Sequence, residues 1–273
     1  MPKIHFIDGE KGGVGKSLFA RTMVQYCLDN NLPFRLVEAD GSNPDVGDIY
    51  GEAYKQAYKQ DCEQIVFTEN EKKAFEADRI FNLATENQVI VNLPSQVYKA
   101  VNRWIDYNGL LDPQLVRDYK VEICKWFVSA GGYDSLQLFM QSATKFEGKV
   151  RHLLVRNLGL CDDWAAVAKT EGLQDVIDKY KVVQVDFPKL SYMERNLLDQ
   201  KRIPFAEAMK RENVDFPILS KQRIANFLKD AYKAIEATKL LEQGEQQGKS
   251  RKKKSEQEQN QQPEQQGDQQ PAA

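Results

Sequence analysis

The amino-acid sequence predicts an α/β fold: a doubly wound, mostly parallel sheet with helices on both faces. Two observations lead to this prediction. Short runs of apolar and β-branched residues alternate with longer segments of helical periodicity along most of the chain, and this alternation is typical of sheets built from strand-helix-strand units. A glycine-rich segment also separates the first apolar run from the first helical one, at the edge where open parallel sheets bind ligands.

Seven short runs are the expected strands. They are rich in Ile, Val, Leu and Phe, and polar or turn-forming residues bound them, as expected for buried parallel strands. They cover residues 4–8, 34–40, 65–68, 89–93, 123–129, 152–157 and 182–186.

Helices are expected between and after these strands. The first follows the glycine-rich segment, and others open on residues that can cap a helix N-terminus, such as Ser95, Asp134 and Asp163. The apolar residues of the last one recur at helical spacing, which predicts that one face packs on the sheet. Together the expected helices cover residues 16–30, 69–85, 95–107, 134–145, 163–169 and 220–241.

The composition changes after the last expected helix. Residues 244–273 are almost all Gln, Glu, Lys, Gly and Pro, and such a segment has too few apolar groups to offset the entropy of ordering. We therefore expect one folded domain at residues 1–243 and a disordered tail at 244–273. The basic cluster at 251–254, like Lys221, Arg223 and Lys229 on the last helix, is either solvated charge or a contact for DNA.

The glycine-rich segment has the composition of a phosphate-binding loop. Its glycines let consecutive backbone N–H groups point into one concavity, Lys16 adds a positive charge, and Ser17 offers a hydroxyl to a phosphate-bound Mg²⁺. The helix that begins at Lys16 adds the positive end of its dipole. The full segment is Lys11-Gly12-Gly13-Val14-Gly15-Lys16-Ser17.

The start of this loop departs from the general pattern. That pattern needs glycine where this chain has Glu10, and the chain has an additional lysine, Lys11. The loop thereby resembles the deviant Walker A motif, K-G-G-x-x-K-[ST], of the ParA/MinD superfamily of P-loop ATPases. The resemblance covers about residues 3–240 and is strongest toward the plasmid mobilisation and stability members, the MobD-like and StbB-like proteins.

The resemblance implies a nucleotide site shared between two subunits. ATP and Mg²⁺ are the implied cofactors, and binding of ATP drives formation of a homodimer in which Lys11 reaches the partner's phosphates. The implied nucleotide contacts run from Lys11 to Leu18, where the family often has a second hydroxyl for the α-phosphate.

The second expected strand ends in acids. Asp40 matches the second acid of the family's D-x-D-P motif, whose implied role is to orient the attacking water, and Glu38 stands where the first Asp usually is. An acid at a strand end is also often a cap or a surface group. The polar, tyrosine-rich residues 45–63 that follow are expected to form a mobile switch segment beside the nucleotide.

The strand at residues 89–93 resembles the Walker B segment without its acid. Asn92 stands where the family has Asp, and an amide accepts a hydrogen bond from a Mg²⁺-bound water but brings no negative charge. We expect Ser17 and Asn92 at the metal, with slow hydrolysis. In the alternative interpretation Asn92 only caps a turn.

Two further segments resemble the family's base-binding elements. Asn157 ends a strand at the place where the family has an Asn that reads adenine, and an amide both donates and accepts, as the adenine edge requires. Pro188 follows the next strand, and the resemblance implies that the backbone there borders the base.

Composition excludes several classes. The four cysteines are far apart and form no C-x-x-C pair, so neither a disulfide framework nor a metal cluster is indicated. The net charge of −2 gives no global basic excess. Neither a secretory signal nor a membrane-spanning run is present, so we expect a cytoplasmic protein.

The loop and the resemblance together predict an ATP-dependent, dimerising molecular switch. We expect it to act in plasmid DNA mobilisation, partition or segregation and to engage DNA or a DNA-bound partner protein. Lys11, Lys16 and Asp40 are the expected catalytic residues of a slow ATPase.

Two other functions remain open at this point. One is an ATP-binding regulatory module with little hydrolysis, which Asn92 favours. The other is a small-molecule ligase or kinase of the same superfamily, whose substrate pocket would be lined by Asp45, Asp48 and Arg103.

Overall fold

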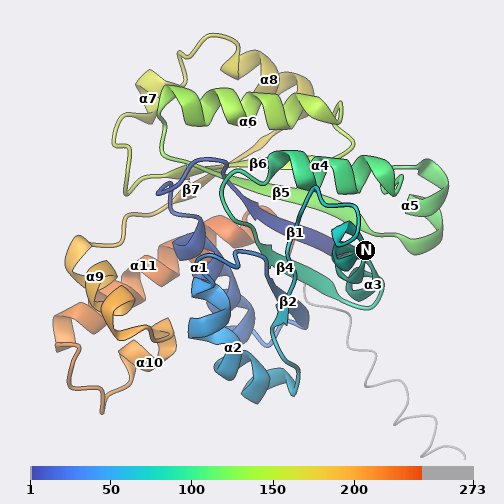
Figure 1. The fold of residues 1–273 in the computed structure, drawn as a ribbon. Coiled ribbons are helices and arrows are strands. Elements are labelled where there is room, and N and C mark those ends of the chain that lie inside the picture. The colour runs from blue at the N-terminus through green and yellow to red at the C-terminus, as the bar shows by residue number, and fades with distance from the viewer. Residues whose placement is uncertain (1, 242–273) are drawn as a thin grey trace, which may run out of the picture. The chain divides into compact units, whose positions relative to one another are not determined.

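A seven-stranded sheet forms the centre of the computed structural model, which describes residues 2–241 (Figure 1). Its order is β3-β2-β4-β1-β5-β6-β7, and every neighbouring pair is parallel. The predicted doubly wound α/β fold is therefore confirmed. The strands are β1 (Lys3–Asp8), β2 (Phe34–Glu38), β3 (Glu63–Gln64), β4 (Gln88–Asn92), β5 (Glu122–Ser129), β6 (Arg151–Asn157) and β7 (Val183–Phe187).

Helices cover both faces of this sheet (Figure 1). One face carries α1 (Lys16–Asp29), α2 (Asp45–Tyr58), α9 (Tyr192–Lys201), α10 (Phe205–Met209) and α11 (Ile218–Glu236). The other carries the short 3-10 helix η1 (Ala74–Ala77), α3 (Asp78–Ala84), α4 (Tyr98–Tyr107), α5 (Pro113–Tyr119), α6 (Tyr133–Lys145), α7 (Trp164–Val167) and α8 (Leu173–Tyr180).

Alternation along the strands supplies both halves of the core. On β5, Trp126 and Val128 join the cluster under α1 and α11, while Phe127 between them joins the cluster under α6. A strand buried on both faces needs a continuous apolar run rather than a one-sided pattern. Such runs are the reason that the sequence identified these strands.

The central position of β1 determines where the loop lies. β1 pairs with β4 on one side and β5 on the other. The strands β2 to β4 are added on one side of β1, and the strands β5 to β7 are added on the other side. This reversal leaves a crevice at the carboxyl edge beside β1, the usual ligand position in doubly wound sheets. The glycine-rich segment follows β1 at this edge.

Some element boundaries differ from the predicted ones. The strand expected at 65–68 is only Glu63–Gln64, because this edge strand pairs with no more than the last two residues of β2. The helix expected at 69–85 begins at Ala74. The helices α2, α5, α8, α9 and α10 were not predicted.

The C-terminal helix packs on the sheet as predicted. Ile224, Phe227, Leu228, Ala231 and Ile235, at helical spacing, are buried and Tyr232 is partly buried, and the helix contacts β7 and α1. No helix within residues 2–241 is long and apolar enough to cross a membrane. The predicted boundary at residue 243 and the tail at 244–273, including its basic cluster at 251–254, lie outside the described residues.

The expectation of a mobile segment at residues 45–63 is wrong for its first fourteen residues, which form α2. Tyr50 and Tyr54 are fully buried, and the Tyr58 hydroxyl donates to the carbonyl of Leu32 at 2.8 Å. Arg202, which ends α9, holds the start of α2 through Asp45 and Asp48. The tyrosines of this segment serve packing because each places a large ring inside and a hydroxyl at a partner.

Replacing Tyr50 by Phe should destabilise the protein by about 1–3 kcal/mol. The Tyr50 hydroxyl donates to Gln25 Oε1 and accepts from the backbone N–H of Phe205, both at 3.1 Å. The substitution leaves the Phe205 N–H buried without its partner, while Gln25 Oε1 keeps only the Ala206 N–H. Urea unfolding measures the change. Tyr107→Phe is the control, because Tyr107 is 84% exposed, and equal effects of the two substitutions would contradict this account.

Candidate functional site

The glycine-rich loop fits closely against the ends of two neighbouring strands. Gly9 and Gly15 have φ angles of 152° and 102°, a region that side chains rarely adopt. A Cβ on Gly9 would lie 2.8 Å from the carbonyl oxygen of Val128, and one on Gly15 would lie 2.4 Å from Asn157 Nδ2. Glycine is therefore required at both ends of the loop, where Gly9 lies against the end of β5 and Gly15 against the end of β6.

Lys16 lies inside the curl of this loop and is buried. Its ammonium donates to the carbonyl of Gly9 at 2.7 Å, to Ser95 Oγ at 2.8 Å and to the carbonyl of Lys11 at 3.3 Å. Burial lowers the pKa of Lys16, while nearby carboxylates oppose that shift. The three acceptors match the three protons of the ammonium, so the charge is held at the centre of the loop.

A buried ion pair supports the loop from below. Asp8, at the end of β1, accepts from the backbone N–H of Gly9 at 2.6 Å and pairs with Lys125 Nζ at 3.3 Å. Lys125 also donates to Asn102 Oδ1 on α4. These contacts fix the point at which the chain leaves β1.

Glu10 is the unusual group of the loop. Its side chain is buried beside Asp8, and its Oε1 has no hydrogen-bond partner. Burial, with the charge of Asp8 as the second cause, raises the pKa of Glu10 to about 7. The residue that interrupts the general loop pattern is thus an acid that titrates near neutral pH.

Lys11 points away from this arrangement. Its side chain is 53% exposed, and its ammonium pairs with Asp134 of α6 at 2.5 Å. Lys11 and Lys16 therefore occupy different environments: Lys16 neutralises the interior of the loop, and Lys11 lies on its outer surface.

Two of the predicted site residues meet through Glu38 at the ends of β2 and β4. The backbone N–H of Asp40 and the Asn92 amide both donate to Glu38 Oε1, at 3.0 and 2.8 Å. Asp40 Oδ1 itself accepts from Ser42 Oγ and the Asn43 N–H. Both the Asp40 carboxylate and the buried Asn92 amide are thereby held in place at the carboxyl edge.

The Asn157 amide binds the loop backbone. Its Nδ2 donates to the carbonyl of Val14 at 2.8 Å, and its Oδ1 accepts from the backbone N–H of Gly159 at 3.0 Å. Pro188 lies next to this turn, because the neighbouring Leu158 N–H donates to the carbonyl of Phe187. One N–H and one lone pair of the amide are not used by these contacts, and base recognition by Asn157 and Pro188 stays a prediction.

The residues expected at Mg²⁺ have the donor chemistry for it. Ser17 is half-buried in the first turn of α1, and Asn92 Oδ1 is buried without a hydrogen-bond partner. Neutral oxygen atoms suit Mg²⁺ that arrives with phosphates and keeps several waters. Within residues 2–241, no group of three or more His, Cys, Asp or Glu side chains is placed to hold a metal ion.

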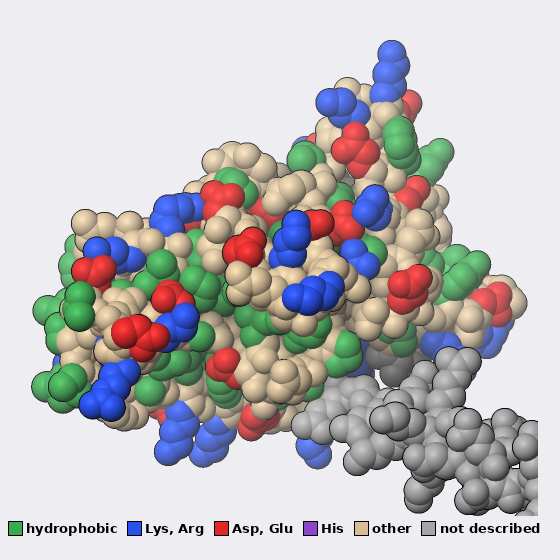
Figure 2. Space-filling model, turned by 90° about the horizontal axis from the view of Figure 1, so that it is seen from below, with side chains coloured by type: hydrophobic (Ala, Val, Ile, Leu, Met, Phe, Trp, Pro, Cys, Tyr) green, Lys and Arg blue, Asp and Glu red, His purple; other side chains and the backbone are tan. Residues whose placement is uncertain are grey.

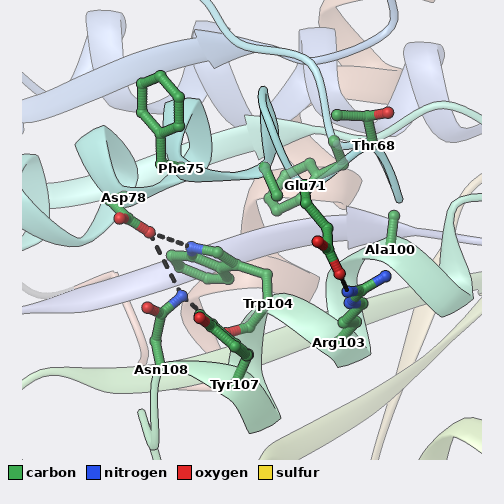
Figure 3. A pocket seen from close by; sticks show the side chains of 11 residues that line it. Thr68, Glu71, Phe75, Asp78, Ala100, Arg103, Trp104, Tyr107 and Asn108 are labelled. Carbon is green, nitrogen blue, oxygen red and sulfur yellow. Dashed lines mark hydrogen bonds and ion pairs between the residues drawn. The ribbon is translucent and has the colours of Figure 1, made fainter.

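The side chains expected to line a small-molecule site do not come together. Asp45 and Asp48 both pair with Arg202. Arg103 instead pairs with Glu71 in a pocket of about 270 Å³ between α4 and the segment before α3 (Figure 3). None of the residues that line this pocket belongs to the loop.

The predicted basic patch on α11 is reduced by internal contacts. Arg223 pairs with the buried Glu194 of α9 at 2.7 Å. Lys221 donates to the carbonyls of Lys210 and Arg211. DNA contact at this helix stays a prediction that rests on Lys229 and on the outer parts of these side chains.

Sequence reasoning did not identify four contributors to the site: Asp8, Ser95, Lys125 and Asp134. Asp8 ends β1 and Ser95 lies three residues after the end of β4, so position at the carboxyl edge was an available signal. Lys125 and Asp134 had none, because a lysine within an apolar strand and an acid in a first helical turn gain meaning only from the loop residues they contact.

Comparison with known proteins gives one sequence relative and several structural ones. No family model matches the chain. Protein MobD of Acidithiobacillus ferrooxidans is 23% identical over 234 residues, which cover 85% of this chain and 96% of MobD. This similarity agrees with the resemblance predicted from the loop.

Solved structures of similar fold include two that contain MinD of Aquifex aeolicus. The MinD cell division protein aligns with 84% of this chain and 95% of its own at 14% identity and a TM-score of 0.47. The MinC:MinD complex aligns with 84% and 94% at 13% identity and a TM-score of 0.44. A nucleotide-binding protein in complex with ADP from Archaeoglobus fulgidus aligns with 73% and 86% at 14% identity and a TM-score of 0.43.

Gly15→Ala should destabilise the nucleotide-free protein by about 2 kcal/mol or more, through the left-handed φ and the clash with Asn157. Gly12→Ala is the matched control in the same loop, because a Cβ there would meet only Ser95 Oγ, at 3.9 Å. We expect the control to change the free energy of unfolding by no more than about 0.5 kcal/mol. Urea unfolding of both variants tests the prediction, which a stable Gly15→Ala variant would contradict.

Glu10→Gln should remove a pH dependence of stability. The pKa of Glu10 rises from 4.5 to about 7 on folding, so between these values the folded state binds more protons and stability falls as pH rises. The loss of unfolding free energy between about pH 5 and about pH 8 should shrink by about 2 kcal/mol in the variant. Exposed Glu86 provides the control Glu86→Gln, and an unchanged pH dependence in Glu10→Gln would refute the assignment.

Proposed function

We propose that this protein is an ATP-dependent, dimerising molecular switch with slow ATPase activity. The observation that carries the proposal is the opposite placement of the two loop lysines, Lys16 inside the loop and Lys11 exposed on its outer surface. The Lys11 ammonium pairs with the exposed Asp134 rather than with its own loop, and a phosphate held by another subunit would replace that partner. The similarity to MobD supports a role in plasmid DNA mobilisation, partition or segregation, with DNA or a DNA-bound protein as the partner in the cytoplasm.

The loop would bind the phosphates of ATP. The backbone N–H groups from Gly12 to Leu18, the start of α1 and the Lys16 ammonium would surround them. Ser17 would hold Mg²⁺ directly and Asn92 would approach it through water, and the ion would neutralise phosphate charge.

Hydrolysis would need little covalent chemistry from the protein. Water attacks the γ-phosphate in line, and positioning and charge neutralisation supply most of the acceleration. Lys16 and the partner's Lys11 would neutralise the charge, and Asp40 would orient the water. Asp40 suits this task because its carboxylate is fixed at the loop edge by Ser42 and Asn43.

Exposed apolar side chains support a second copy of the chain as the partner. Tyr133, Leu160 and Tyr192 are 70%, 43% and 69% exposed and follow the carboxyl ends of β5, β6 and β7. Figure 2 shows that hydrophobic side chains also gather at the left end of the lower face, where α9 and the start of α11 lie. Exposed apolar groups beside the loop are typical of a surface that another protein covers.

A second function is favoured by one observation. Asn92 brings no charge to the metal, as suits a regulatory module that binds ATP and hydrolyses little of it. The ligase or kinase alternative lacks such support, since Arg103 and the pair Asp45 and Asp48 lie in separate clusters. Phosphate release without an added metabolite distinguishes the switch from both.

Lys11→Ala should abolish dimerisation but preserve ATP binding. Light scattering should show that ATP and Mg²⁺ double the mass of the wild type and leave the mass of the variant unchanged. Asp134→Ala and the exposed-lysine control Lys72→Ala should dimerise like the wild type. If the mass of the wild type does not respond to ATP, the proposed switch is refuted. If Asp134→Ala also fails to dimerise, loss of the ion pair within one chain, rather than loss of a contact to the partner's phosphates, explains the effect of Lys11→Ala.

A further inference from the structure

One buried carboxylate joins three elements at the edge of the proposed ATP site. Glu38 ends β2, is 1% exposed, and accepts four hydrogen bonds. Its Oε1 receives Asp40 N at 3.0 Å and Asn92 Nδ2 at 2.8 Å, and its Oε2 receives the N–H groups of Val46 and Gly47, both at 3.0 Å. All four lone-pair positions of the carboxylate are therefore occupied.

This carboxylate also caps α2. The helix begins after Pro44, which provides no side-chain cap, and Val46 and Gly47 supply its second and third N–H groups. Glu38 accepts both from a neighbouring strand, and its negative charge faces the positive end of the helix. The start of α2 and the Asp40 turn are thereby tied to β2.

The same contacts determine the orientation of Asn92. Three backbone N–H groups require Glu38 to act as an acceptor, so Asn92 must present its NH₂ group to it. Asn92 Oδ1 is consequently turned away from Glu38, and it is buried without a hydrogen-bond partner. Asn92 pairs with Ile7 in the sheet, two residues before the loop begins at Gly9.

We propose that Glu38 is the positioning residue that enables Asn92 to replace a metal-site acid. Glu38 orients and polarises the amide, and Asn92 Oδ1 then accepts from a water on the nucleotide-bound Mg²⁺. The negative charge of the site lies on β2 rather than β4 and acts through a hydrogen bond. This inference rests on the proposed function, because it concerns the metal that accompanies ATP.

The arrangement makes the two positions interdependent. Asp at position 92 would place two carboxylates 2.8 Å apart at a buried site, where both cannot be ionised without a large cost. Gln at position 38 would turn an NH₂ group toward other donors. The double substitution restores one carboxylate and one amide with their places exchanged.

The test measures how much Mg²⁺ strengthens ATP binding. The affinity for a fluorescent ATP analogue is determined in Mg²⁺ and in EDTA for the wild type, Glu38→Gln, Asn92→Asp and the double variant, with Asn82→Asp as an exposed control. In each single variant, the gain in affinity from Mg²⁺ should be about tenfold smaller than in the wild type, a typical effect of removing a residue that orients a metal ligand. The double variant restores the pair between positions 38 and 92 but leaves the Asp40 N–H facing an NH₂ group, so it should recover part of the gain. Affinity in EDTA should be equal throughout.

Each outcome separates this inference from the proposed function. A wild type that binds no ATP refutes the proposed function itself. A wild type with a Mg²⁺ gain that the single variants retain overturns the inference alone. Recovery of thermal stability but not of the Mg²⁺ gain in the double variant also overturns it, because the pair would then be only structural. If Glu38→Gln does not fold, Asn92→Ala, which keeps the backbone bonds of Glu38, must lose the gain.

Discussion

The buried ion pair between Asp8 and Lys125 is the interaction on which the site depends. Both side chains are almost inaccessible to solvent, so their desolvation cost must be offset by good local contacts. The Gly9 N–H and Asn102 Oδ1 provide them, and the pair thereby connects β1, β5 and α4 at the point where the loop begins. Removal of one partner would leave an uncompensated charge beneath the loop, whereas exposed ion pairs elsewhere contribute little.

The loop in turn organises the charges around the site. Lys16 donates to two loop carbonyls and to Ser95, so the loop is closed around its own cation. A phosphate that entered would replace these acceptors rather than fill a preformed space. The acids nearby, Asp8, Glu10 and Asp40, make a second source of positive charge valuable when a polyanion binds.

The sequence predicted those elements whose residues form a recognisable pattern within one short segment of the chain. The β1-loop-α1 unit and the buried face of α11 follow from short apolar runs, glycine spacing and helical periodicity. The helix α2 was missed because its polar composition concealed apolar positions at helical spacing, Val46, Ile49, Tyr50 and Tyr54. The partnership of Glu38 with Asn92 could not be predicted, because 54 residues separate them and only the adjacency of β2 and β4 brings them together.

The contact between Lys11 and Asp134 has a consequence for the behaviour of the loop in solution. Both side chains are more than half exposed, and such a pair contributes about 0–1 kcal/mol and weakens as salt screens it. It directs Lys11 without binding it firmly, so little free energy opposes its transfer to a stronger anion. The loop thus carries one buried lysine whose place is fixed by three hydrogen bonds and another whose place depends on the ionic strength around it.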